Sequence, residues 1–89
     1  MAWQIELSSS AERDLDSLDL EIGRRVLKFL YERVANLENP RSLGQALTGS
    51  DLGSLWRYRV GDYRILCDIQ DQRVLILVVE VGHRREVYR

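Results

Sequence analysis

The stretch WRYRVGDYRI, residues 56 to 65, constrains the fold of this 89-residue chain more than any other segment. Apolar and charged side chains alternate there with a period of two, a pattern typical of strands that are buried on one face. Gly61 and Asp62 interrupt the alternation, and a glycine in the first central position of a two-residue loop favours a hairpin. With that loop, Val60 pairs with Tyr63, and the rest of the register follows from this pair.

The predicted register places like charges opposite each other on one face of the hairpin. Arg59 lies opposite Arg64, and Arg57 lies opposite Leu66. Because like charges at opposed positions destabilise a sheet, a group outside the hairpin is expected to offset the repulsion. The arginines either form an open, solvated face or bind a polyanion through paired guanidinium–phosphate hydrogen bonds. The lack of alternating signs across the strands favours the second interpretation.

The elements before the hairpin are predicted to be one strand and two helices. AWQIEL, residues 2–7, reads as a short first strand. Ser9 and Glu12 have the spacing of a capping box that begins a short helix. Apolar residues at helical spacing then predict a second helix over 22–37, which ends before Asn39-Pro40. The glycine- and serine-rich stretch that follows, RSLGQALTGSDLGS, is expected to be a connection without regular structure.

The elements after the hairpin complete one α+β domain over residues 1–89. A turn is expected at Gln70-Asp71-Gln72, and VLILVVEV then reads as a strand that is covered on both faces. The resulting order is strand, helix, helix and three strands. It predicts a small, mostly antiparallel sheet with a helical pair packed on one face.

The composition excludes several classes of protein. No apolar run approaches the ~20 residues of a membrane helix, and the N-terminus does not resemble a secretory signal. One cysteine cannot form an internal disulfide, which favours a reducing cytosol, and with one histidine it does not make a zinc site. We therefore expect a cytoplasmic protein with no cofactor, metal or membrane partner. Magnesium-binding carboxylates are not expected on the arginine-bearing side, because Asp62 lies in the turn and Glu80 in the last strand.

The net charge of −1 hides an asymmetry between the two parts of the chain. Residues 1–51 carry six basic and nine acidic side chains, whereas residues 52–89 carry seven basic and five acidic ones. The small total argues against a general nucleic-acid binder but leaves room for a local cationic site. Only Lys28 is a lysine among the basic residues, which suits phosphate recognition by arginine, although a GC-rich genome gives the same bias.

The closing residues GHRREVYR are either a frayed polar terminus or part of a site. His83 brings a titratable imidazole, Tyr88 a phenol, and Arg84 and Arg85 further positive charge. RNA supplies its own nucleophile, the 2′-OH. A protein that cuts RNA therefore needs to orient that group, neutralise the charge at phosphorus and protonate the leaving 5′-oxygen, with no metal.

The block LxxLWRYRVGDYRILCDI and the closing VEVGHRREVYR together resemble the RelE branch of the RelE/ParE toxin superfamily over nearly the whole chain. The resemblance implies a type II toxin–antitoxin toxin: an endoribonuclease that cuts mRNA in the ribosomal A site and so inhibits translation. It also implies a RelB-like cognate antitoxin, and contact with operator DNA only as the toxin–antitoxin complex. Two alternatives stay open: a ParE-like DNA gyrase inhibitor without nuclease activity, and an inactive member whose arginines bind only an acidic antitoxin segment.

Matched by position, the resemblance implies a set of catalytic residues. They are Arg57, Arg59, Arg64, Arg84 and Tyr88. The same four arginines and Arg85 are expected to bind RNA. Better-known members have lysines where this chain has its first two arginines, and arginine stays protonated in proteins. The proton acceptor is therefore either His83, the titratable group beside Arg84, or no residue of this chain, in which case positioning and ribosomal groups do the work.

Overall fold

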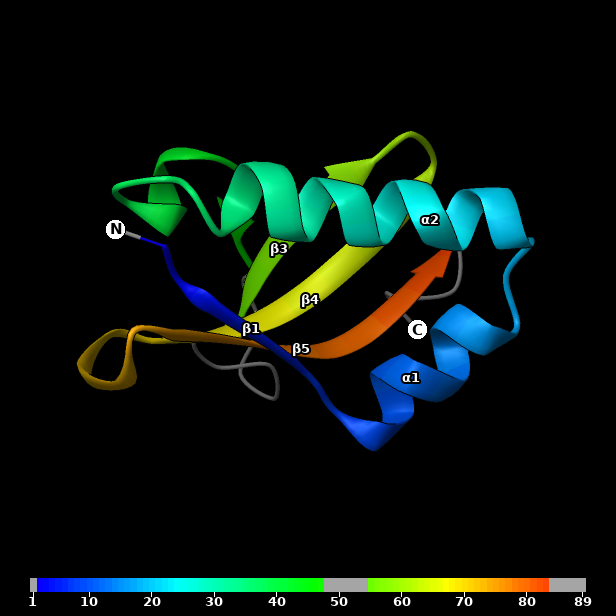
Figure 1. Cartoon of the computed structure of the whole chain (residues 1–89), viewed down its shortest axis with the longest axis horizontal. Coiled ribbons are helices and arrows are strands. Elements are labelled where there is room, and N and C mark those ends of the chain that lie inside the picture. The colour runs from blue at the N-terminus through cyan, green and yellow to red at the C-terminus, as the bar shows by residue number, and fades with distance from the viewer. Residues whose placement is uncertain (1, 48–54, 84–89) are drawn as a thin grey trace.

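Five strands form one sheet in the order β1-β5-β4-β3-β2, and two helices pack on one of its faces (Figure 1). The computed structural model describes residues 2–47 and 55–83. The strands are β1 (Gln4–Leu7), β2 (Gln45–Ala46), β3 (Trp56–Val60), β4 (Tyr63–Gln70) and β5 (Leu75–His83). Only the β1–β5 pair is parallel. The α+β class and the mostly antiparallel sheet are confirmed, with the short strand β2 as an addition.

Helix α1 (Ser9–Asp16) begins one residue earlier than the capping-box spacing predicts. Its N-cap is Ser8, whose Oγ accepts a hydrogen bond from the Ala11 N–H at 3.0 Å. The same hydroxyl donates to the Val79 carbonyl of β5 at 3.0 Å. The assignment of Ser9 as the cap was therefore wrong, because Ser8 can satisfy both the helix end and the neighbouring strand.

Helix α2 (Leu20–Lys28) continues into a π-helical turn, η1 (Phe29–Val34), before it ends. The Ala35 N–H donates to the Leu30 carbonyl, five residues back, at 2.9 Å. This wider turn brings both Val34 and Ala35 into the core. The second helix was thus predicted correctly in type, but its regular α-helical part is shorter than 22–37.

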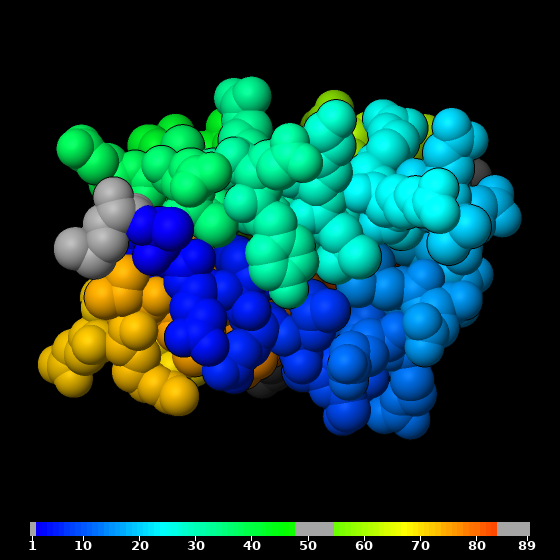
Figure 2. All heavy atoms as spheres, viewed as in Figure 1, coloured from blue at the N-terminus to red at the C-terminus, as the bar shows by residue number. Residues whose placement is uncertain are grey.

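The main hydrophobic core lies between the sheet and the helices. It includes Val26 and Leu30 from the helical layer and Tyr58, Ile65 and Val78 from the sheet. In the space-filling view the second helix lies directly above β1, the edge strand of the sheet (Figure 2). None of the helices within residues 2–47 and 55–83 has the length and apolar character needed to cross a membrane.

The connection after the helices has more structure than its composition suggests. A 3-10 turn, η2 (Pro40–Ser42), leads into strand β2, which pairs with β3. Gly44 between them has φ +83°, and a Cβ at this position would lie 2.4 Å from the Arg57 carbonyl oxygen. Glycine is needed here because only it combines positive φ with so close an approach of two backbones.

Candidate functional site

The hairpin of β3 and β4 has the predicted register. Val60 pairs with Tyr63, Arg59 with Arg64, and Arg57 with Leu66. Gly61 in the turn has φ +58°, as the glycine-first loop requires. The three arginines therefore lie on the side of the sheet that faces away from the helices, which we call the arginine face.

The three arginines differ in their surroundings. Arg59 is exposed, whereas Arg57 and Arg64 are half-buried. The Arg57 guanidinium donates to Oε1 of Gln45 in β2, so the short strand holds this side chain in position. Arg57 and Arg59 line a hollow of about 250 Å³ together with Gly44 and Gln45. Two guanidinium groups beside a small polar hollow can bind a phosphate through several charge-assisted hydrogen bonds.

The arginine face is only partly open, in contrast to the open, solvated face that was one of the two interpretations of the sequence. Leu66 and Leu47 are buried on this side, and Leu55 and Val79 pack against them. This second, smaller cluster provides an apolar floor beside the arginines. The cationic groups are thus held against a packed surface.

A β-bulge between β4 and β5 decides which side chains reach this face. Cys67 pairs with Val78, but the next residue of β4, Leu66, pairs with Glu80, so Val79 is the extra residue. Paired residues share a face of the sheet. Glu80 therefore lies on the arginine face beside Leu66, and Gly82 lies there opposite Arg64. No local sequence pattern predicts this position. Glu80 is thus on the arginine face, although its place in the last strand was a reason to expect no magnesium-binding carboxylates there.

His83 lies on the other side of the sheet, beyond the same bulge. It pairs with Tyr63, and the two rings make an edge contact with centroids 5.6 Å apart. It lines a cavity of about 310 Å³ that also contacts Ile22 and Arg25 of α2. The structure thus does not bring His83 together with the arginines of the hairpin. Three further predicted site residues lie outside the described residues: Arg84, Arg85 and Tyr88.

Other reactive side chains near the hairpin are locked in the core. Cys67 is fully buried, and burial raises the pKa of its thiol. Tyr58 is also buried, and burial raises the pKa of its phenol. Both groups stay neutral at physiological pH and face the helices. Within residues 2–47 and 55–83, no three His, Cys, Asp or Glu side chains gather closely enough to hold a metal ion.

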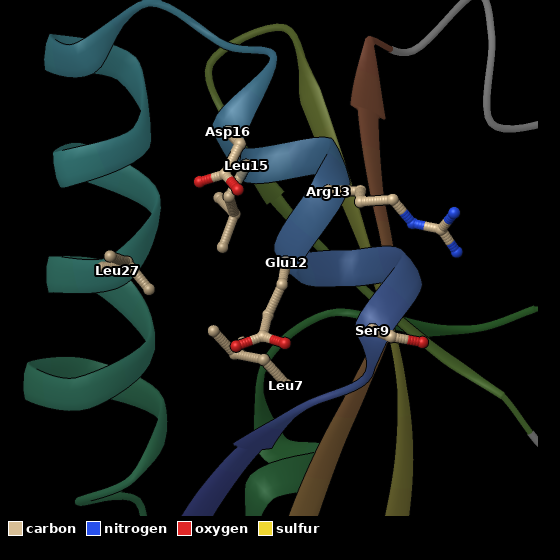
Figure 3. Close-up of a pocket in the computed structure, with 7 residues that line it drawn as sticks. All are labelled: Leu7, Ser9, Glu12, Arg13, Leu15, Asp16 and Leu27. Atoms are coloured by element: carbon tan, nitrogen blue, oxygen red, sulfur yellow. The ribbon is translucent and has the colours of Figure 1, made fainter.

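A groove of about 520 Å³ between α1 and α2 has a different character (Figure 3). Leu15 and Leu27 line it from the two helices, with Glu12 and Asp16 at its edge. The Arg13 side chain, in contrast, points away from α2 (Figure 3). Leucines flanked by carboxylates do not suit a polyanion. The arginine face is therefore the better candidate for a nucleic-acid site.

Comparisons with known proteins agree on one family. The family model for the ParE toxin of the type II toxin–antitoxin system parDE matches residues 5–88. The chain is 30% identical to Toxin RelE of Mycobacterium tuberculosis over 87 residues, which cover 98% of this chain and 87% of the relative. It is 28% identical to Toxin RelG of the same organism over 89 residues, with 100% and 99% of the two chains covered.

Solved structures show the same fold. The RelBE2 toxin–antitoxin complex of M. tuberculosis contains a chain that matches with a TM-score of 0.85 and 26% identity, covering 97% of this chain and 95% of that one. A free form of the E. coli toxin RelE matches with a TM-score of 0.77 at 22% identity, covering 98% and 88%. The second likeness supports the fold alone.

Proposed function

Because the chain belongs to the RelE/ParE superfamily of toxins of type II toxin–antitoxin systems, we propose that it is a RelE-like endoribonuclease. Its substrate is mRNA, cut by attack of the ribose 2′-OH on the adjacent phosphate. The products are a 2′,3′-cyclic phosphate and a 5′-OH. The reaction needs no metal, since guanidinium groups supply the positive charge at phosphorus.

The observation that carries this proposal is the direct opposition of Arg59 and Arg64 on a face without the helices. Two like charges in adjacent strands cost stability in the free protein. A phosphate bound between them changes that repulsion into attraction, and the attraction grows as negative charge develops on the phosphorane. Arg57 at the neighbouring hollow extends the cationic strip along the RNA backbone.

The remaining roles follow from side-chain chemistry. Arg57, Arg59 and Arg64 hold the scissile phosphate and stabilise the transition state. Arg84 and Arg85 add RNA binding, and Tyr88 stacks on a base or donates a proton to the leaving oxygen. His83 faces the helix side in this chain, which weakens its candidacy as the proton acceptor.

The biological setting follows from the family. Solved relatives include toxin–antitoxin complexes from M. tuberculosis and from the archaeon Pyrococcus horikoshii. A RelB-like antitoxin is therefore the proposed inhibitor, and the toxin contacts operator DNA only within that complex. We place the reaction in the cytoplasm, at the A site of the ribosome.

A second candidate function is inhibition of DNA gyrase by binding alone. The observation that favours it is the matching family model, which describes ParE toxins of parDE systems. This function needs no cationic face. The opposed arginines are therefore unexplained by it, and we rank it second.

Primer extension on cellular mRNA after brief induction of the toxin separates the two candidates. A nuclease produces codon-phased cuts in mRNA while the chromosome stays intact. A gyrase poison produces double-strand DNA breaks with intact mRNA, and that result would overturn the proposal. Co-expression of the antitoxin should suppress the cuts, which controls for damage caused by slow growth.

A further inference from the structure

The proposed cleavage requires a group that accepts the proton of the 2′-OH, and the inference below rests on that proposed function. The hairpin arginines cannot accept a proton, because guanidinium stays protonated in proteins. His83 packs against Tyr63 on the helix side of the sheet. Neither the hairpin arginines nor His83 can therefore accept the 2′-OH proton on the arginine face, and another acceptor is needed there.

The bulge in β5 brings a carboxylate to this face. Glu80 is exposed and pairs with Leu66, which itself pairs with Arg57, so the three residues form one row across three strands. Neighbouring strands lie about 4.8 Å apart, so the backbones of Arg57 and Glu80 are separated by roughly 10 Å. The side chain between them, Leu66, is buried and forms a floor. This separation leaves room for a phosphate and the adjacent ribose hydroxyl.

The next row of the sheet adds no side chain from β5 next to Glu80. Arg64 pairs with Gly82, which has no side chain. Glu80 is the diagonal neighbour of Arg64, and such neighbours lie about 7–8 Å apart, within reach of long side chains. An RNA phosphate held by Arg64 is therefore adjacent to the Glu80 carboxylate.

Helix α1 fixes the backbone on both sides of Glu80. The Ser8 hydroxyl donates to the Val79 carbonyl at 3.0 Å, and Asp14 Oδ2 accepts a hydrogen bond from the Val81 N–H at 3.0 Å. β1 pairs with β5 only as far as Val78. Beyond the last β1–β5 pair, these two hydrogen bonds therefore hold the backbone of the bulge in place.

We propose that the Glu80 carboxylate is the proton acceptor for the 2′-OH. The hydroxyl proton moves to a carboxylate oxygen as the 2′-oxygen forms a bond to phosphorus. The bond from phosphorus to the 5′-oxygen breaks, and the leaving oxygen takes a proton from a water molecule on the other side of the phosphate. Charge and atoms balance, and Glu80 returns its proton to water before the next turnover.

Asp68 is the natural comparison, because alternation along β4 places it on the same face, opposite Leu77. It is two residues beyond Leu66, and its Oδ2 accepts a hydrogen bond from the Gln70 side chain at 3.0 Å. The Asp68 carboxylate is thus occupied by a neighbouring side chain and lies farther from Arg64 than Glu80 does. A simpler role for Glu80 also exists: its charge offsets the arginine repulsion without taking part in the reaction.

The test measures single-turnover cleavage of mRNA on programmed ribosomes by wild type, Glu80→Gln, Asp68→Asn and His83→Gln. Affinity is measured separately with an mRNA that has one 2′-deoxyribose at the cut site and cannot be cleaved. We expect Glu80→Gln to lower the cleavage rate by roughly 10²–10⁴-fold, the usual contribution of a general base. Affinity should be unchanged or tighter, because one negative charge is removed. The control variant Asp68→Asn should cleave at close to the wild-type rate, whereas His83→Gln tests the competing acceptor.

Three outcomes would overturn the assignment. If Glu80→Gln cleaves at the wild-type rate and only the thermal midpoint falls, Glu80 merely offsets the arginine charges. If rate and affinity fall together, it positions the arginines. If His83→Gln or Asp68→Asn shows the loss in place of Glu80→Gln, another group is the acceptor. If the wild-type protein does not cut RNA at all, the proposed function fails, and that result is distinct from these three.

Discussion

Replacing Tyr58 with phenylalanine removes one hydroxyl from the strand that carries Arg57 and Arg59. Tyr58 is fully buried, and its hydroxyl donates to the Pro40 carbonyl at 2.5 Å. The ring remains in place, so packing is nearly unchanged and the main loss is the hydrogen bond. A buried carbonyl left without its donor costs about 1–3 kcal/mol. We expect the free energy of unfolding to fall by that amount.

Urea unfolding followed by tryptophan fluorescence measures this loss. The midpoint should fall with an unchanged slope, and the thermal midpoint should fall by roughly 4–8 °C per kcal/mol in a domain of this size. Tyr31→Phe is the matched control, since Tyr31 is 50% exposed and its substitution should be nearly neutral. A loss below about 0.5 kcal/mol for Tyr58→Phe would show that this contact does not hold the β2 connection to the sheet.

The pH dependence of stability in the alkaline range provides a second test of Tyr58. Burial raises the pKa of Tyr58 in the folded protein. The folded form therefore stays neutral at pH values where the unfolded chain ionises. The resulting stability is fully present below the unfolded pKa, near ~10, and is lost as the pH rises above it. Tyr58→Phe should lose less stability than wild type over that range.

Three further substitutions test other parts of the structure. The hydrogen bond from Arg41 lowers the pKa of Asp71 in the folded protein. The ionised Asp71 therefore stabilises the fold above its unfolded pKa, and this stabilisation disappears as the pH falls. The difference in unfolding free energy between wild type and Asp71→Asn should accordingly shrink in acid. Gly44→Ala should cost roughly 1–3 kcal/mol in urea unfolding, because its Cβ meets the Arg57 carbonyl at positive φ. Leu66→Ala should cost about 2 kcal/mol by the same measurement, at the low end for a buried leucine because its cluster is small.

The hairpin was predictable because its signals are local. Alternation identifies the buried side, and a glycine-first loop sets which residues pair, so the opposition of Arg59 and Arg64 followed from the sequence. The order of helices and strands followed from periodicity in the same way. Strand β2 did not, because two residues carry no alternation and it is held by Gly44 and by contacts with β3.

The sequence did not predict which reactive side chains of β5 lie on which face of the sheet. Whether Glu80 or His83 joins the arginines depends on one extra residue, Val79, in the β5 ladder. Unbroken alternation from the buried Val78 would place Glu80 on the helix side and His83 with the arginines. The residues at the bulge form hydrogen bonds with Ser8 and with Asp14 of α1, which are far away in the sequence, so no local pattern reveals it.

The central claim, that opposed arginines on this face bind the scissile phosphate, is tested most directly with Arg64→Gln. This variant removes the charge and keeps most of the side-chain stem. Single-turnover mRNA cleavage and thermal unfolding are measured on the same preparation, with Arg33→Gln as a control because Arg33 is exposed in η1, within the helical layer.

We predict that Arg64→Gln slows cleavage by at least ~10²-fold, the usual effect of losing one transition-state donor. Its thermal midpoint should stay the same or rise, because Arg59 no longer faces a like charge. The control should match wild type in both measurements. Cleavage at the wild-type rate by Arg64→Gln, with the fold intact, would contradict the claim.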